Sequence, residues 1–332
     1  MRKFIVYVLV LFLMVPAVFV PTVAWTAKAE YSFIFGGSSA IDTLLDLANR
    51  RFIDLVTERS DGRVEIKFYP ADQLGGDIAQ IQSVMAGSQH LYGDVLVWLA
   101  NWHKDFSLFG WAFAFRDSDH LAKFLKGPIF AKMVDEFEKE NGVKILGTAV
   151  PTDHRIFFGK KPVFGLEDIQ GIKMRVPEIE TYLRVWEGLD TYPTRVTWAE
   201  IYMALRQGVV DACEGPVTAA YGDKFHEAGP YVVLTNHLIS TYYLLMNGKG
   251  YDRLPPDLKK VFDDAATETS EWARARAEEY EGETLDKMVA EGATLIRIDM
   301  RPWREKIAAA TEAMEAKGMW SKGLFQKIQE IK

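Results

Sequence analysis

Between residues 30 and 148 the chain alternates short apolar segments with amphipathic helical ones, and this alternation constrains its fold most strongly. The helical segment over 40–57 gathers its apolar side chains on one face, whereas 64–69 alternates apolar and polar residues with the period of a strand. The patterns predict strands at 30–36, 64–69, 94–98 and 143–148, and helices at 40–57, 77–86 and 118–140, the last broken at Gly127-Pro128. Strands and helices in this order are typical of an α/β domain with a largely parallel sheet.

The rest of the chain predicts a second α/β domain, and a length of 332 residues suits about two domains. A polar helical stretch over 255–289 is too hydrophilic to be buried all round. Two apolar segments, 231–234 and 241–246, are expected to carry the chain back to the first domain. The remaining predictions are strands at 155–158, 172–176 and 293–298, and helices at 179–187 and 198–207.

The first 29 residues have the pattern of a secretory signal. Arg2 and Lys3 precede an apolar run over 4–23, and Ala27-Lys28-Ala29 offers a small-residue cleavage site. The run is long enough for an uncleaved membrane anchor, but two prolines within it and the cleavage site favour removal. We therefore expect a mature chain from Glu30 in the periplasm of a Gram-negative-type cell, with no lipoprotein cysteine after the leader.

Charge and cysteine content exclude several classes of function. The formal net charge is −7, and leader removal makes it more negative by three because Arg2, Lys3 and Lys28 leave with no acid. A basic nucleic-acid footprint is absent, so we expect no nucleic acid partner. Cys213 is the only cysteine, which excludes an intrachain disulfide, and the six histidines are dispersed. Because no P-loop, dinucleotide fingerprint or hydrolase motif occurs, we expect no cofactor, no metal and no enzyme.

The stretch from Gly165 to Pro216 carries the strongest functional signal. Arg175 lies within the short apolar strand 172–176. A guanidinium held there needs an anion, and a carboxylate can accept two parallel hydrogen bonds from it. The alternative is an ion pair within the second domain. Arg155 precedes another apolar strand, and the residues alone suggest for it an ion pair with Asp153 at the surface.

The motif resembles the substrate-binding proteins of TRAP transporters, of the dicarboxylate-binding (DctP-type) family. Two further segments share this resemblance, 59–75 (Arg-Ser-Asp-Gly-Arg-Val-Glu-Ile-Lys-Phe-Tyr-Pro, then Gln73-Leu74-Gly75) and 234–237 (Leu-Thr-Asn-His). It covers nearly the whole mature chain. It implies a hinged, two-domain α/β periplasmic binding protein of the Venus-flytrap type, with a long helix spanning both domains. The expected boundaries are 30–152 plus about 240–280 for domain I, and 153–239 plus about 281–332 for domain II.

The resemblance also implies roles for individual residues. Arg175 would bind the ligand carboxylate, Arg155 would contact the same anion from the side, and Trp198 would pack on the bound molecule, with helix-start packing as its alternative. Glu214 would accept a ligand hydroxyl or, as we favour, orient Arg175. Gly215 stands where many sugar-acid-binding members have asparagine.

The departure at Gly215 leaves room for a bulkier group. It favours a monocarboxylate, aromatic or of the 2-oxo or 2-hydroxy type, over C4-dicarboxylates and sugar acids, which stay open. First-domain contacts are expected from Ser38, because open α/β sheets bind ligands at the carboxyl ends of strands. Trp98 is expected to line the same site unless it belongs to the core.

Together these features predict a monomeric periplasmic solute receptor. It would bind an organic acid anion through an arginine–carboxylate clamp and deliver it to the membrane subunits of a sodium-dependent TRAP permease. A ligand-binding accessory protein of a sensor system, or a periplasmic enzyme acting on organic acids, are the alternatives.

Overall fold

The computed structural model describes residues 29–332, so the expected signal segment lies outside the described residues. One mixed sheet of nine strands runs through the molecule in the order β2-β1-β3-β8-β4-β7-β5-β6, and β9 pairs with β8. The strands are β1 (Tyr31–Gly36), β2 (Val64–Tyr69), β3 (Leu91–Asp94), β4 (Val143–Gly159), β5 (Lys173–Val176), β6 (Tyr192–Arg195), β7 (Ala212–Pro216), β8 (Tyr231–Asn247) and β9 (Thr294–Ile296).

Helices cover this sheet and agree closely with the periodicity of the sequence. For example, α4 begins with Pro128 at its first position and is followed by Gly142, whose φ of 64° is the left-handed conformation that closes helices. The helices are α1 (Leu44–Arg59), α2 (Asp77–Ala86), α3 (Ser118–Leu125), α4 (Pro128–Asn141), α5 (Glu180–Gly188), α6 (Ile201–Gln207), α7 (Val217–Gly222), α8 (Phe225–Ala228), α9 (Gly248–Asp252), α10 (Pro256–Ala290), α11 (Arg301–Ala316) and α12 (Leu324–Gln329).

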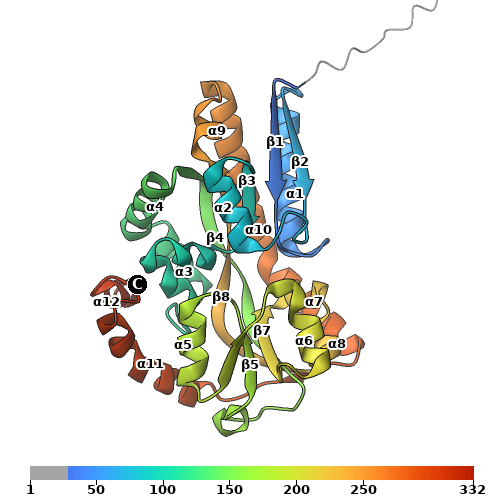
Figure 1. Ribbon diagram of the computed structural model, residues 1–332, viewed down its shortest axis with the longest axis vertical. Coiled ribbons are helices and arrows are strands. Elements are labelled where there is room, and N and C mark those ends of the chain that lie inside the picture. The colour runs from blue at the N-terminus through green and yellow to red at the C-terminus, as the bar shows by residue number, and fades with distance from the viewer. Residues whose placement is uncertain (1–28) are drawn as a thin grey trace, which may run out of the picture.

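The elements form two lobes (Figure 1). The first lobe, at the top, contains β1, β2, β3, α1, α2 and α9, and the second, at the bottom, contains β5, β6, β7, α5, α6, α7 and α8. The strands β4 and β8 are each 17 residues long and pass through both lobes. They pair antiparallel along their length with register shifts between Leu146 and Val150 and between Pro151 and His154.

These shared strands differ from the sequence prediction. The patterns predicted separate strands at 143–148 and 155–158, and at 231–234 and 241–246, because the polar residues between them interrupt the apolar runs. In the structure the interruptions are irregularities within continuous strands. The sheet is also mixed rather than largely parallel, since β8 runs antiparallel to both β3 and β4.

The predicted strand at 94–98 is wrong. The strand β3 ends at Asp94, and Leu96–Asn101 forms a 3₁₀ helix, η1. Leu96, Val97 and Leu99 are buried there. A short apolar run cannot by its pattern be distinguished from a buried helical turn, which explains the error. The consequence is that the chain turns sharply just after Asp94.

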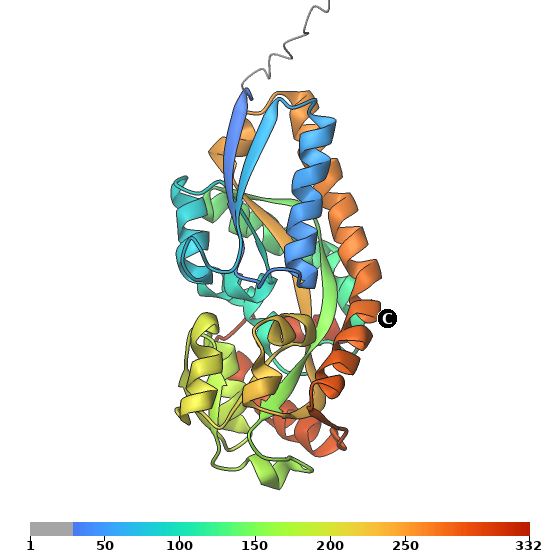
Figure 2. The same cartoon turned by 90° about the vertical axis from the view of Figure 1, so that its right-hand side faces the viewer.

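Helix α10 has 35 residues and lies along both lobes, as the resemblance implied (Figure 2). It packs on α1 in the first lobe and on α7 in the second, and it crosses β4. Gly147 permits this crossing, because a side chain at its position would meet the backbone nitrogen of Thr267 at 2.7 Å. Its φ of 62° also favours glycine.

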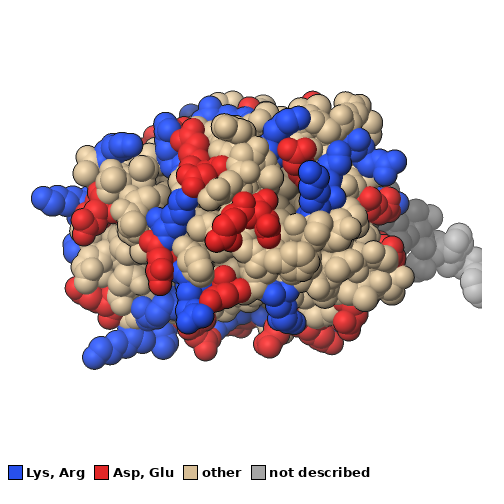
Figure 3. Space-filling model, turned by 90° about the horizontal axis from the view of Figure 1, so that it is seen from below, with Lys and Arg blue, Asp and Glu red and all other residues tan. Residues whose placement is uncertain are grey.

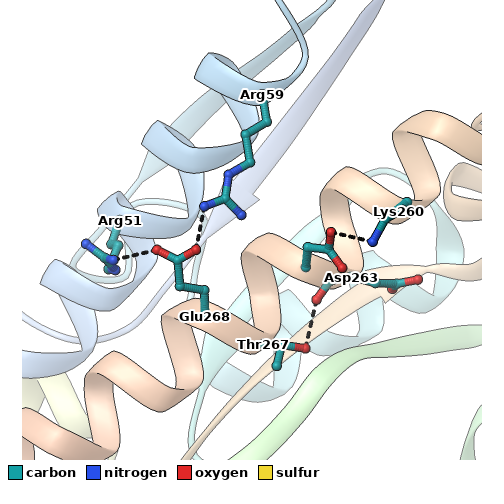
Figure 4. Close-up of polar contacts among 7 residues, drawn as sticks. Arg51, Arg59, Lys260, Asp263, Thr267 and Glu268 are labelled. Carbon is teal, nitrogen blue, oxygen red and sulfur yellow. Dashed lines mark hydrogen bonds and ion pairs between the residues drawn. The ribbon is translucent and has the colours of Figure 1, made fainter.

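An ion cluster joins α10 to α1. The carboxylate of Glu268 on α10 accepts a hydrogen bond from Arg51 at 2.8 Å and another from Arg59, both on α1 (Figure 4). All three side chains are partly exposed, so the cluster adds little to the packing energy of the two helices.

Basic and acidic side chains are interspersed over the outer surface of the second lobe seen from below (Figure 3). None of the helices within residues 29–332 combines the length and the apolar character needed to cross a membrane.

Candidate functional site

A pocket lies between the two lobes. Five of the seven predicted site residues line it, namely Ser38, Trp98, Arg155, Arg175 and Trp198. Asp77 and Asp94 of the first lobe and Tyr182 of the second lobe line it too. An adjoining hollow shares Asp77, Trp98, Arg175 and Trp198 with the pocket, and is also lined by Asp72 and Glu178.

Arg175 projects from β5 into this pocket with unsatisfied hydrogen-bond donors. Its side chain is buried, with a relative exposure of 1%. Nε donates to the carbonyl oxygen of Val196 at 2.9 Å, but Nη1 and Nη2 have no acceptor among residues 29–332. Burial lowers the pKa of Arg175 to about 10, so the guanidinium is still charged at neutral pH. Two N–H-bearing nitrogens of one guanidinium thus offer a ready site for a carboxylate.

Trp198 holds one side of this guanidinium. The Arg175 guanidinium carbon lies 5.6 Å from the centre of the indole ring, in a cation–π arrangement. The indole N–H donates to Asp223 at 2.7 Å, and the ring packs against Phe225 at a centroid distance of 4.8 Å. These contacts fix the ring, so Trp198 is a rigid wall of the pocket.

Gly215 lies behind Trp198 and does not line the pocket. A Cβ at its position would come within 2.9 Å of the indole ring. The sequence interpretation gave the space over Gly215 to a bulky ligand group, and this differs from the structure. The protein's own indole fills that space.

Arg155 and Glu214 form a buried ion pair on neighbouring strands. Arg155 donates from Nε and Nη2 to the two carboxylate oxygens of Glu214, at 2.6 and 2.7 Å. Burial alone would raise the pKa of Glu214, but attraction to Arg155 overcomes it and holds that pKa below its ordinary range. Arg155 does not form the alternative surface ion pair with Asp153, because Asp153 instead accepts hydrogen bonds from Thr218.

The expectation that Glu214 orients Arg175 is not met, and strand register explains why. Arg155 lies opposite Pro216 in the antiparallel β4–β7 pair, which places Arg155 and Glu214 on one face of the sheet. In the parallel β5–β7 pair, Met174 lies opposite Ala212, so Arg175 takes the other face. Glu214 therefore pairs with Arg155, and Arg175 has no hydrogen bond to a carboxylate among residues 29–332, although attraction to Glu214 opposes the lowering of its pKa by burial.

The first lobe opposes the arginines with carboxylates that were not among the predicted site residues. Asp77, at the start of α2, accepts a hydrogen bond from the Tyr92 hydroxyl. Asp94, at the end of β3, accepts from the backbone N–H of Val95 at 2.8 Å and from the Ser39 hydroxyl at 3.5 Å. Both side chains are 6% exposed.

The environment of these acids disfavours their charged forms. Burial and then repulsion by Asp77 raise the pKa of Asp94 well above its ordinary value. Burial raises the pKa of Asp77, opposed by the Tyr92 hydrogen bond. Burial and repulsion by Asp77 raise the pKa of Asp72 to about 7. The first-lobe wall thus holds buried carboxyl groups that can take part in hydrogen bonds, and Arg175 across the pocket is the cation whose attraction opposes the rise in the pKa of Asp77.

The sequence contains a signal for Asp94 that the predicted set of site residues left out. The strands β1 and β3 are parallel neighbours, with Gly36 opposite Tyr92, so their carboxyl ends emerge side by side. The rule that selected Ser38 after β1 selects Asp94 at the end of β3 equally well. The erroneous strand over 94–98 concealed this end.

Arg195 and Cys213, which lie close to Arg175 and Glu214 in the sequence, do not line the pocket. Arg195 is exposed and donates to Glu180 at 2.7 Å. Cys213 is buried, and burial raises the pKa of its thiol, which suits an inert core residue. Within residues 29–332, no cluster of three histidine, cysteine or acidic side chains is arranged to hold a metal.

Comparisons with known proteins match this architecture over most of the chain. Residues 35–317 match the family described as "Bacterial extracellular solute-binding protein, family 7". The C4-dicarboxylate-binding periplasmic protein DctP of Rhodobacter capsulatus is 25% identical over 304 residues, which cover 90% of this chain and 89% of that protein.

Solved structures agree with this match. A TRAP periplasmic solute-binding protein from Ochrobacterium anthropi, with bound L-fuconate, is 26% identical with a TM-score of 0.84, covering 91% of this chain and 99% of that one. The sugar acid binding protein DctPAm of Advenella mimigardefordensis, in complex with galactonate, is 25% identical with a TM-score of 0.85, covering 91% and 98%.

Proposed function

The chain belongs to family 7 of the bacterial extracellular solute-binding proteins, the DctP family of TRAP periplasmic binding proteins, and from this premise we propose that it is a receptor that grips an organic acid by its carboxylate at Arg175. The family consists of binding proteins, which confirms the prediction that the chain is not an enzyme.

The observation that carries the proposal is the state of the Arg175 guanidinium. It is buried, charged and oriented by Val196, yet Nη1 and Nη2 have no acceptor within the part of the chain that the structure describes. Stranding buried donors costs about 1–3 kcal/mol, and more when they are charged. A ligand carboxylate removes this cost by accepting from both nitrogens. Arg155 is already satisfied by Glu214, so it contributes side contact and positive potential rather than the primary grip.

The relatives guide the choice of acid to be tested first. Those with solved structures bind galactonate and L-fuconate, which are monocarboxylates with many hydroxyl groups. The pocket pairs an arginine with carboxyl groups that can accept hydroxyl hydrogen bonds, which supports a hydroxylated acid here as well. Because Trp198 fills the space over Gly215, the case for an aromatic ligand loses its main support.

Membership of this family also suggests how the bound acid is delivered to a membrane permease. The proposed sequence of events begins with removal of the leader and release into the periplasm. The acid binds between the lobes, which correspond to domain I (30–152 plus about 240–280) and domain II (153–239 plus about 281–332). Contacts to both lobes favour the closed form, since a ligand shifts such an equilibrium only by binding one state better. The closed receptor, as a monomer, then docks on a TRAP-type sodium-dependent permease.

The test is ligand binding by the mature protein, unfolded and refolded to remove carried-over acid. Thermal shift against sugar acids, 2-oxo acids, dicarboxylates and aromatic acids identifies the class, and calorimetry measures affinity. Arg175→Ala is expected to abolish binding while the protein stays folded. Arg195→Ala, which removes an exposed arginine of the same lobe, is the matched control and should bind normally. Equal affinity in the two variants would exclude Arg175 from the site.

A further inference from the structure

We propose that the first-lobe wall of the pocket, formed by Asp77 and Asp94, selects ligands whose far end donates hydrogen bonds and carries no negative charge. The ligand would have one carboxylate at Arg175 and a hydroxyl or a protonated amine at the opposite end, and dicarboxylates would be refused. This inference rests on the proposed function of Arg175 and names the class of acid.

The balance of charge in the pocket carries the argument. Two arginines line it, but Glu214 accepts two hydrogen bonds from Arg155 and neutralises it. Among the described residues that line the pocket, Arg175 is then the remaining cation available to a ligand anion. Arg175 would already be occupied by the first ligand carboxylate, and no other unpaired arginine or lysine of the described chain lines the pocket. A second ligand carboxylate would therefore be buried without a counter-ion, beside Asp77 and Asp94, where the surroundings already disfavour negative charge.

The same wall accepts hydrogen bonds readily. The second oxygen of Asp94 accepts from the Ser39 hydroxyl at 3.5 Å, a long contact that a ligand donor can replace. Asp72, in the adjoining hollow, has an oxygen without a partner among residues 29–332. Carboxyl groups at such positions suit the hydroxyls of a polyol chain or an ammonium group, both of which donate hydrogen bonds.

The two ends of the pocket come from different lobes. Arg175 belongs to β5 of the second lobe, whereas Asp94 ends β3 and Asp77 begins α2 in the first lobe. A ligand with an anion at one end and donors at the other therefore contacts both lobes at once. A ligand that lacked the donors would leave the first-lobe carboxyl groups facing apolar surface, which is unfavourable.

Matched ligands test the proposal. One series is galactonate, its 6-amino-6-deoxy derivative and galactarate, which share a six-carbon skeleton and end in hydroxyl, ammonium and carboxylate. A second series is butyrate, 4-hydroxybutyrate, 4-aminobutyrate and succinate. Calorimetry at pH 7.5 is expected to show the hydroxyl or ammonium member binding about tenfold to a hundredfold tighter than the methyl or carboxylate member, as a charge-assisted hydrogen bond would give. Whether the hydroxyl or the ammonium ligand binds more tightly shows whether the far end of the natural ligand is neutral or cationic.

Variants separate this selection from general damage. Asp94→Asn keeps an acceptor for the Val95 N–H, and Asp77→Asn keeps one for Tyr92. Each is expected to improve binding of the dicarboxylate relative to the donor ligands, a gain that misfolding cannot produce. Asp54→Asn, the same change at an exposed position of α1, should leave the ranking unchanged.

Two results would overturn the inference in distinguishable ways. Tight binding of a dicarboxylate that is lost in Arg175→Ala would refute the selection by Asp77 and Asp94 and retain the proposed function. Absence of binding by every member of both series, together with no effect of Arg175→Ala in the broader screen, would refute both.

Discussion

Arg155 donates two hydrogen bonds to Glu214, from Nε at 2.6 Å and from Nη2 at 2.7 Å, across the β4–β7 strand pair. The pair is almost fully buried, and His237 approaches the same carboxylate, with its Nε2 3.4 Å from a Glu214 oxygen. Because Arg155 and Glu214 neutralise each other, Arg175 stays available to an external anion.

Breaking this pair on one side should be worse than removing it altogether. Glu214→Met leaves Arg155 buried without its anion and is expected to destabilise the protein by about 3–5 kcal/mol. The double variant Arg155→Met/Glu214→Met should recover part of that loss, because neither charge is stranded. Chemical denaturation of the wild type, both single variants and the double variant gives the coupling energy. Strict additivity would contradict the arrangement described here.

Replacing Arg175 should stabilise the ligand-free protein. Its Nη1 and Nη2 are buried without acceptors among the described residues, so Arg175→Met removes an unsatisfied charged group and retains apolar volume. We expect a gain of about 1–3 kcal/mol in unfolding free energy, together with loss of ligand binding. Arg195→Met, at an exposed site, should change stability by less than about 0.5 kcal/mol. A destabilised Arg175→Met would indicate that the guanidinium has a structural partner.

Asp72 should make stability fall as pH rises through the mildly acidic range. Its pKa is about 7 in the folded protein, whereas an unfolded aspartate titrates at about 3.9. Between these values the folded state binds more protons than the unfolded state, so raising the pH favours unfolding. Asp72→Asn removes this pH dependence. The variant should therefore become more stable relative to the wild type as the pH rises from 5 to 8.

The Asp72→Asn substitution suits its position. The backbone φ of 58° is one that asparagine adopts readily. Melting temperatures of the two proteins at pH 5 and pH 8 provide the measurement, with Asp54→Asn as the exposed control. A difference between wild type and Asp72→Asn that stays constant with pH would show that Asp72 titrates normally.

A methyl group at position 215 should disturb the pocket through Trp198. The Cβ of Gly215→Ala would lie 2.9 Å from the indole ring, which must shift and so disturb its contact with Arg175. Overpacking of this kind costs about 1–3 kcal/mol, and ligand affinity should fall with it. Gly282→Ala, in the open on α10, is the matched control and should leave binding intact. Tryptophan fluorescence and calorimetry together report the displacement and its effect.

The local pattern of the sequence predicted most elements because their apolar faces are regular. Strand β2 and helix α2 begin and end where the periodicity does. Long elements that cross between lobes were harder, since β4 and β8 contain bulges that look locally like strand ends. Strand β6 was missed because its residues are mostly exposed and include Pro193.

The residues of the candidate site also fall into those that the sequence indicated and those that it did not. Arg175 and Arg155 stood out because an arginine within an apolar strand is conspicuous. Their partners did not, because which of them meets Glu214 depends on the alignment of β4, β5 and β7, which no single segment specifies. Asp77 and Asp94 look like ordinary helix-start and strand-end acids until the lobes are brought together.

The strands β4 and β8 and the helix α10 pass through both lobes, and this has a consequence for how the protein loses its structure. Strand β3 of the first lobe hydrogen-bonds to β8, β7 of the second lobe hydrogen-bonds to β4, and the two lobes share β4 and β8. A proteolytic or genetic cut between the lobes would therefore yield fragments that cannot fold alone. We therefore expect one cooperative melting transition, with backbone amides of both lobes becoming exposed to deuterium exchange together.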